Sequence, residues 1–350
     1  MKRADYTSAL FAAFMLAFIP GCDVHEFPDA VETAVEQSLV AFRLKLDFST
    51  DMPLYTEVQY SSRSVVTTYQ ARYIVNIYEP ESDGSYGRTY SEQHIFTGTD
   101  ADSLDMTVTI DLEEGDYKFM VWTDYVPEGS TDDWYYDTSN FAGIEITDNY
   151  EGATDYRDAF RGSVTAEVTV DCDSAVVEMS RPMAKYEFIS EDLDEFIEKA
   201  IAKAMASENA GSTDGSELSY DDIARSINLA DYFVMFAYTS YMPCSYNLFT
   251  DRPADSATGM YYYGALSQLS DTEAELGFDY VFVNGNATSV QVALYVYDKY
   301  SELIASSDVI TVPLMRSQLT VVRGDFLTSE ASGGVGIVPD YDGDYNIELE

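Results

Sequence analysis

The sequence predicts a mainly β protein made of two tandem β-sandwich domains, with a helical insertion in the second. Aromatic residues make up 14% of the chain, 29 of them tyrosines, and they fall in short alternating runs that suit half-buried strands. Only one segment shows a strong helical period. A chain of 350 residues is long enough for two cores of about 150 residues each after a leader is removed.

Residues 1–21 have the form of a bacterial lipoprotein signal peptide. Lys2 and Arg3 precede an uncharged apolar run that is too short to span a bilayer core of about 30 Å as a helix. A glycine stands directly before Cys22, as in the site of lipoprotein signal peptidase. We expect several acyl chains on Cys22, because one chain alone binds a membrane only marginally. An ordinary secretory peptide with a chance cysteine is the alternative. Residues 22–36 are expected to form a tether, and their acidic start favours the outer membrane or cell surface.

The charge of the chain excludes one class of partner. The sequence holds 62 acidic and 19 basic residues, a formal net charge of −43 at pH 7. Nucleic-acid binding needs a basic surface that releases counterions, and no basic stripe is present in this sequence. We therefore expect no nucleic-acid partner. The same charge disfavours lying flat on anionic lipid, so anchoring would depend on the acyl chains.

The first predicted sandwich covers residues 37–181. Its clearest strand is Val40–Phe48, in which apolar and charged residues alternate, so that one face is expected to be buried and the other exposed to solvent. A turn at Glu113–Asp116 predicts a hairpin between the strands on its two sides. The further strands expected in this domain are Tyr69–Tyr78, Met106–Leu112, Tyr117–Thr123, Val164–Cys172 and Val176–Met179.

The boundary of the first domain is set by proline. Arg181–Pro182 marks a junction, because proline cannot continue a paired central strand. Cys172 shares the parity of the apolar residues in the strand before it, so its side chain is expected to point inward.

The second predicted sandwich covers residues 182–350 and has a helical insertion at 190–231. Ser190 is the expected N-cap of a helix whose apolar stripe, from Leu193 to Met205, packs on its own domain or on another protein, the first being favoured. A short helix follows near Asp221–Ile227. The strands expected are Lys185–Ile189, Phe233–Tyr238, Leu276–Val283, Val290–Tyr297, Leu303–Ser306 and Leu319–Val322, with a closing pair of Val335–Val338 and Tyr345–Leu349 joined through Asp340–Asp344.

No catalytic pattern stands out in the sequence. His25 lies in the expected tether, and His94 has no nucleophile or metal partner nearby. No nucleophile elbow, phosphate loop or metalloprotease helix is present in the sequence. Asp340–Asp344 resembles half of a calcium loop, but an acidic turn is favoured. We therefore expect no enzyme activity, no cofactor and no metal.

Cys172 and Cys244 are the thiols that remain after acylation of Cys22. In an oxidising compartment these two cysteines could form a disulfide. They lie in different predicted domains, so two buried free cysteines are favoured.

Several segments, in order along the chain, resemble the FimB-type anchor subunits of protease-assembled (type V) fimbriae. They are Cys22–Pro28, Tyr117–Tyr125 (YKFMVWTDY), Arg181–Tyr186 (RPMAKY), Tyr241–Asn247 (YMPCSYN), Leu276–Asn284 (LGFDYVFVN) and Leu319–Thr328 (LTVVRGDFLT). The resemblance implies two transthyretin-like β-sandwiches, fixed to the outer membrane by Cys22 at the base of a pilus. It also implies contact with fimbrillin-like subunits through β-strands.

The resemblance assigns a role to the first strand. Stalk subunits of such fimbriae lose their first strand to a protease and accept a strand from a neighbour, whereas an anchor keeps its own. Val40–Phe48 would be that retained strand, with Arg43 and Lys45 protected inside it. A donor role for Tyr345–Glu350 is not expected, because no long tail follows. Asp-Ser motifs at Ser103, Ser174 and Ser256 match an O-glycosylation pattern of envelope proteins in the anaerobes whose fimbrial lipoproteins this chain resembles.

The competing hypothesis is a surface lipoprotein that binds a host glycan or protein. Its binding surface would be tyrosine-rich loops at Trp134–Tyr136 and Tyr261–Tyr263. Aromatic clusters suit the faces of sugars, and they also fill the cores of sandwiches.

Overall fold

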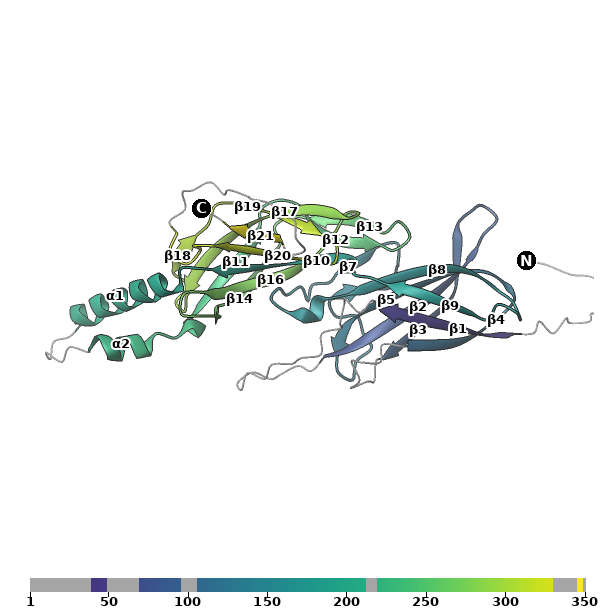
Figure 1. Cartoon of the computed structure of the whole chain (residues 1–350), viewed down its shortest axis with the longest axis horizontal. Coiled ribbons are helices and arrows are strands. Elements are labelled where there is room, and N and C mark those ends of the chain that lie inside the picture. The colour runs from purple at the N-terminus through teal and green to yellow at the C-terminus, as the bar shows by residue number, and fades with distance from the viewer. Residues whose placement is uncertain (1–38, 49–68, 96–105, 212–218, 330–344, 349–350) are drawn as a thin grey trace, which may run out of the picture. The chain divides into compact units, whose positions relative to one another are not determined.

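The structure is a computed structural model that describes residues 39–48, 69–95, 106–211, 219–329 and 345–348 (Figure 1). These residues belong to one compact unit, Leu39–Glu350. Within the described ranges the chain is mainly β, with two α-helices, two 3₁₀-helices and five sheets, which confirms the predicted fold class. The predicted signal peptide, Cys22 and the predicted tether at 22–36 lie outside the described residues.

Two sheets form the N-terminal part of the fold (Figure 1). The three-stranded sheet has the order β4-β1-β9, and the four-stranded sheet has the order β3-β2-β5-β8. Buried side chains of both sheets, among them Phe42, Val75 and Phe119, form one hydrophobic cluster, which we call the N-terminal cluster. The strands are β1 (Val40–Phe48), β2 (Tyr69–Pro80), β3 (Tyr86–Ile95), β4 (Met106–Leu112), β5 (Gly115–Pro127), β8 (Phe160–Val168) and β9 (Ser174–Met179).

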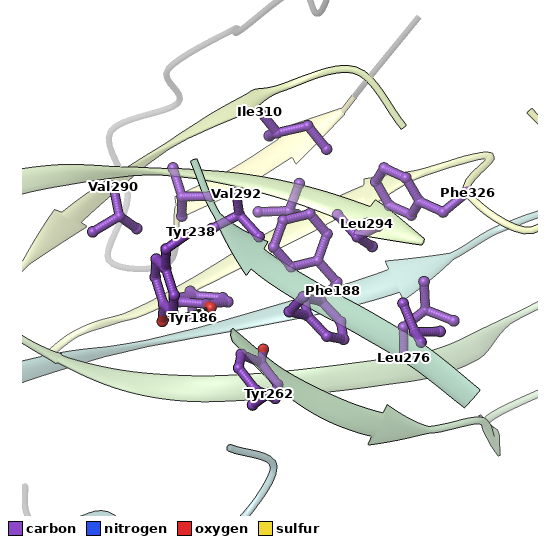
Figure 2. Packing of buried hydrophobic residues seen from close by; sticks show 14 of the residues in the cluster. Tyr186, Phe188, Tyr238, Tyr262, Leu276, Val290, Val292, Leu294, Ile310 and Phe326 are labelled. Carbon is purple, nitrogen blue, oxygen red and sulfur yellow. Dashed lines mark hydrogen bonds between the residues drawn. The ribbon is translucent and has the colours of Figure 1, made fainter. Parts of the chain in front are cut away.

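Two further sheets enclose the C-terminal cluster, part of which is shown in Figure 2. One has the order β15-β16-β10-β20-β21, and the other has β14-β11-β17-β18 with β19 also pairing β17. Side chains such as Phe188, Leu276 and Leu294 meet between them. The strands are β10 (Met183–Ser190), β11 (Tyr232–Tyr238), β14 (Tyr261–Ala265), β15 (Ser267–Gln268), β16 (Ala274–Phe282), β17 (Ala287–Asp298), β18 (Leu303–Ser306), β19 (Ile310–Met315), β20 (Leu319–Gly324) and β21 (Tyr345–Glu348).

The fifth sheet joins the two sides of the expected junction at 181–182. Its order is β13-β12-β7-β6, so strands from before and after the junction pair with each other. A central cluster likewise holds Trp122 and Tyr136 together with Tyr246 and Phe282. The elements are β6 (Tyr136–Asp137), β7 (Ile144–Ile146), the 3₁₀-helix η1 (Asp155–Arg157), β12 (Met242–Asn247) and β13 (Arg252–Ala257).

The helices lie in the predicted insertion. They are α1 (Leu193–Gly211), α2 (Tyr220–Ser226) and the 3₁₀-helix η2 (Leu229–Asp231). Leu193 and Phe196 of α1 belong to the C-terminal cluster, and Ile201 is buried as well. The favoured expectation, that the apolar stripe packs on its own domain, is therefore confirmed for these residues.

Ser190 is not the N-cap of α1, because it ends β10 and the helix starts at Leu193. The Ser190 hydroxyl donates to the Asp192 carboxylate and accepts the Phe326 N–H at 3.0 Å. Asp192 in turn accepts backbone N–H groups from Leu327 and Thr328, the latter at 2.7 Å. Ser190 and Asp192 therefore bind the backbone of the segment that follows β20. The sequence around the start of α1 does not indicate this long-range contact.

The predicted hairpin at Glu113–Asp116 is wrong. β4 pairs with β1, whereas β5 pairs with β2 and β8, so the chain passes from one sheet to the other at this turn. Val108 and Ile110 of β4 and Phe119 of β5 all belong to the N-terminal cluster. Because β4 and β5 lie in facing sheets, they bury these side chains between the sheets. The alternating pattern of each strand would be the same in a hairpin, so the local sequence does not separate the two arrangements.

The expectation that Cys172 points inward is also wrong. β8 ends at Val168, and Thr169 and Cys172 then close a turn through reciprocal backbone hydrogen bonds of 3.1 Å. The turn breaks the alternation of the strand, so Cys172 is exposed.

The other predicted strands in the described ranges are found; β1, β4 and β18 have the expected bounds, and the ends of the rest are shifted by a few residues. β21 pairs with β20 in parallel. Its expected hairpin partner Val335–Val338 and the turn Asp340–Asp344 lie outside the described residues. Eight of the described strands were not predicted, namely β3, β6, β7, β12, β13, β14, β15 and β19. β3 and β13 are exposed at most positions and so lack an alternating pattern.

Candidate functional site

The strand β1 is the first candidate site, because its backbone is paired along both edges. Val40–Leu46 pair with β4 in antiparallel register, and Arg43–Phe48 pair with β9 in parallel register. Residues 43–46 therefore have a strand on each side. A segment in this position presents no unpaired edge to a protease or to another strand.

The inward face of β1 is a substantial part of the N-terminal cluster. Phe42, Leu44 and Leu46 are fully buried. The ring of Phe42 stacks on that of Phe119 with centroids 4.9 Å apart. Each such side chain contributes roughly 1.5–3 kcal/mol by leaving water. β1 is therefore part of the core, and its loss would expose the cluster.

The outward face of β1 carries the two basic residues. The Arg43 guanidinium lies 2.8 Å from the Asp173 carboxylate, and the Arg43 N–H donates to the Asp173 carbonyl at 2.8 Å. Both side chains of this pair are exposed, so its contribution to stability is small. The backbone bond matters more here, because it holds the start of β9 against β1.

The second candidate is a buried polar group around Asp279, which we call the Asp279 cluster. Asp279 accepts hydrogen bonds from Tyr150 at 2.7 Å and from Tyr238 at 2.6 Å, and it pairs with Arg157. The Tyr238 hydroxyl also lies 2.8 Å from that of Tyr186. Asp279 and Arg157 are almost wholly buried. The cluster therefore connects η1 to β16 and β11 across the expected junction.

The electrostatics of the Asp279 cluster follow from burial and pairing. Burial raises the pKa of Asp279, while Arg157 and the two tyrosine hydroxyls lower it in part. Burial lowers the pKa of Arg157, but Asp279 and the surrounding tyrosines together outweigh this and the net shift is upward. Asp279 and Arg157 are both buried away from solvent, so the Asp279 cluster stabilises the fold and is not placed to contact a ligand. The sequence gives no local sign of it, because its members are far apart in the chain.

The predicted modification and thiol sites fall in several places. Cys22 and Ser103 lie outside the described residues, whereas Ser174 and Ser256 are exposed, at the start of β9 and in β13. Cys172 and Cys244 are free. Cys244 is half-buried, and burial raises the pKa of its thiol. The expectation of free cysteines is confirmed, but Cys172 is not buried.

The two tyrosine-rich segments differ in accessibility. Tyr135 and Tyr136 are buried in the central cluster and Trp134 is half-buried, so the first segment is not an open binding loop. Tyr261–Tyr263 belong to β14 rather than to a loop. Tyr262 is buried between exposed neighbours, and Tyr261 and Tyr263 are left on the surface.

Metal and membrane features were sought in the described part of the chain. Its His, Cys, Asp and Glu residues include no group of three or more placed to hold a metal ion. His94 stacks on Tyr73 with ring centroids 4.8 Å apart. In the same described ranges, no helix is both long and apolar enough to cross a membrane.

Comparison with known proteins gives one family. A model described as "Family of unknown function (DUF6562)" matches residues 36–350. A search of curated proteins found no match.

Solved structures similar to this chain include proteins of Bacteroides and Parabacteroides species. A candidate adhesin of Bacteroides ovatus is 8% identical, with 95% of this chain and 99% of that chain covered and a TM-score of 0.40. A candidate polysaccharide-binding protein of Bacteroides thetaiotaomicron is 10% identical, with 76% and 79% covered and a TM-score of 0.40. A fimbrial assembly protein of Parabacteroides distasonis is 12% identical, with 82% and 92% covered and a TM-score of 0.36. Similarities at these scores do not decide the function of this chain.

Proposed function

This chain belongs to DUF6562, a family of unknown function, and we propose that it is an outer-membrane lipoprotein with a structural and adhesive role at the base of a pilus. Acyl chains on Cys22 hold it to the membrane. It contacts fimbrillin-like subunits through β-strands, as in the fimbrial anchor subunits that its sequence resembles. The proposed role involves no chemical reaction and no cofactor.

The observation that supports this proposal most is the position of β1 between β4 and β9. In strand exchange, a subunit that has lost a strand accepts one from its neighbour through main-chain hydrogen bonds and side-chain pockets. Here the chain's own β1 already fills that position, with Phe42, Leu44 and Leu46 in the core. A subunit that keeps this strand cannot accept another there, so it ends a polymer.

The protection of its basic residues also supports the proposal that β1 is retained. Proteases cleave segments that can leave the fold and enter the enzyme as an extended chain. Arg43 and Lys45 lie in the part of β1 that is paired on both sides. Releasing them requires breaking two strand pairings and exposing three fully buried side chains. A protease that removes the first strand of a neighbouring subunit would therefore spare this one.

The proposal is tested by capture from native outer membranes. The tagged, lipidated protein is isolated in strong detergent, and bound proteins are identified by mass spectrometry. Cys22→Ala removes the acylation site, and Cys172→Ala is the matched control because it changes an exposed, free cysteine. We expect fimbrillin-like subunits with the wild type and with Cys172→Ala, and none with Cys22→Ala. Wild-type protein that leaves the membrane fraction without detergent, or that captures no such subunit, would contradict the proposal.

A further inference from the structure

The outward face of the sheet β14-β11-β17-β18 carries aromatic side chains. Val234, Phe236 and Tyr262 of β11 and β14 point into the C-terminal cluster, so the residues between them point outward. Strand register places the outward residues in rows across the sheet. Met235 lies between Tyr263 and Tyr295, and Phe233 lies between Ala265 and Tyr297. We call Tyr261, Tyr263, Phe233, Met235, Tyr295 and Tyr297 the aromatic platform.

Four rings of the aromatic platform, those of Tyr261, Tyr263, Phe233 and Tyr297, touch in sequence across three strands. Tyr261 and Tyr263 have ring centroids 5.8 Å apart. Tyr263 and Phe233 are 5.6 Å apart, and Phe233 and Tyr297 are 5.4 Å apart and stacked. Tyr261 and Tyr263 are 53% and 54% exposed, and the other members are half-buried. These contacts hold the rings in fixed positions and leave two of them open to a ligand.

The composition of the aromatic platform is unusual for an outward sheet face. Such faces of antiparallel sheets are ordinarily polar. The platform holds no charged side chain, although the chain has 62 acidic and 19 basic residues. A contiguous apolar surface on a soluble domain marks a binding site.

A pocket of about 600 Å³ adjoins the platform at Tyr261 and Tyr263, which line it. Asp148, Glu151 and Thr147 also line this pocket. Its lining residues include no Lys, Arg or His. The carboxylates can accept hydrogen bonds from hydroxyl groups, and they repel an anionic ligand.

We propose that the aromatic platform and the adjoining pocket bind a neutral saccharide chain. A pyranose ring has an apolar C–H face that packs on an aromatic ring, and its hydroxyls donate to carboxylates such as Asp148 and Glu151. The aromatic platform would provide the ring packing, and the carboxylates of the pocket would accept the hydrogen bonds. Saccharides with carboxylate or sulfate groups are excluded by the acidic pocket.

The test is equilibrium binding to a fixed panel of oligosaccharides with the full mature chain. The neutral probes are hexasaccharides of β-glucan, α-glucan, xylan, mannan and galactan, and the anionic probes are sialyllactose and oligogalacturonate. Tyr261→Ala and Tyr263→Ala remove exposed rings, so both variants should stay folded. Tyr220→Ala is the matched control, because Tyr220 is 52% exposed on α2, outside the platform. Thermal unfolding of each variant verifies that it is folded.

We expect at least one neutral probe to bind, and Tyr263→Ala to weaken it about tenfold, as loss of an aromatic contact does. Tyr220→Ala should leave the affinity unchanged, and the anionic probes should not bind. Absence of binding across the neutral panel overturns the proposal, as does binding that survives the Tyr261→Ala, Tyr263→Ala double variant. Concentration-dependent self-association that this double variant abolishes would instead assign the platform to contact between copies of the chain.

Discussion

Asp279→Ala should be the most damaging single change to the polar interior. The change removes the partner of Arg157, which is almost wholly buried, and the acceptor of the Tyr150 and Tyr238 hydroxyls. Removing one member of a buried ion pair leaves an uncompensated charge, at a cost of about 3–5 kcal/mol. Two buried hydroxyls without an acceptor push the effect to the upper part of that range.

Urea unfolding at neutral pH measures this loss directly. The Asp279→Ala, Arg157→Met double variant removes both charges of this pair, so it should be more stable than Asp279→Ala alone. Glu195→Ala is a control, because the Glu195–Lys199 pair is exposed on α1 and contributes only about 0.3–0.5 kcal/mol. If Asp279→Ala lowers the free energy of unfolding by less than about 1 kcal/mol, the Asp279 cluster does not hold η1 to β16 as inferred.

Three more outcomes follow. Leu44→Ala should lower the free energy of unfolding by about 3 kcal/mol, since Leu44 is fully buried in β1. It should also speed trypsin cleavage at Arg43. Cleavage as slow as in the wild type would contradict the inference that core contacts hold β1 in the fold. Burial raises the pKa of Tyr246 from 10.0 to about 12, so its contribution to stability is present below pH 10 and is lost as the pH rises through 12. The ultraviolet difference titration of wild type against Tyr246→Phe should show this late ionisation, and a midpoint near 10 would refute it. Cys172 should react with a thiol reagent faster than Cys244 in the native protein, by mass spectrometry of the labelled peptides, and equal rates would contradict the exposed turn.

Local pattern was enough to find most elements. The alternation of Val40–Phe48 predicted a strand with one buried face, and β1 has that burial pattern at nearly every position. The apolar stripe that begins at Leu193 predicted α1 and the face that it buries. Both signals depend only on the period of side-chain directions along one element, which is fixed by backbone geometry.

Local pattern failed where a strand's surroundings decide its role. The prediction of a loop at Tyr261–Tyr263 is wrong, because these residues belong to β14, where the sheet buries Tyr262 and exposes Tyr261 and Tyr263. Three tyrosines in a row do not show locally which side chain is buried. The prediction of where strands end failed for the same reason. The alternation of residues before Cys172 predicts an inward side chain, but the turn at Thr169–Cys172 leaves it exposed.

The sequence by itself determined the β class of this protein, its acidity and the period of its main strands, and it predicts a lipoprotein start at Cys22. Only the tertiary structure decided which strands share a sheet, that β1 is paired on both edges, and that Arg157 meets Asp279. The physical reason is distance along the chain. Periodicity and charge are properties of neighbouring residues, whereas sheet partners, buried ion pairs and the aromatic platform join residues that only packing brings together.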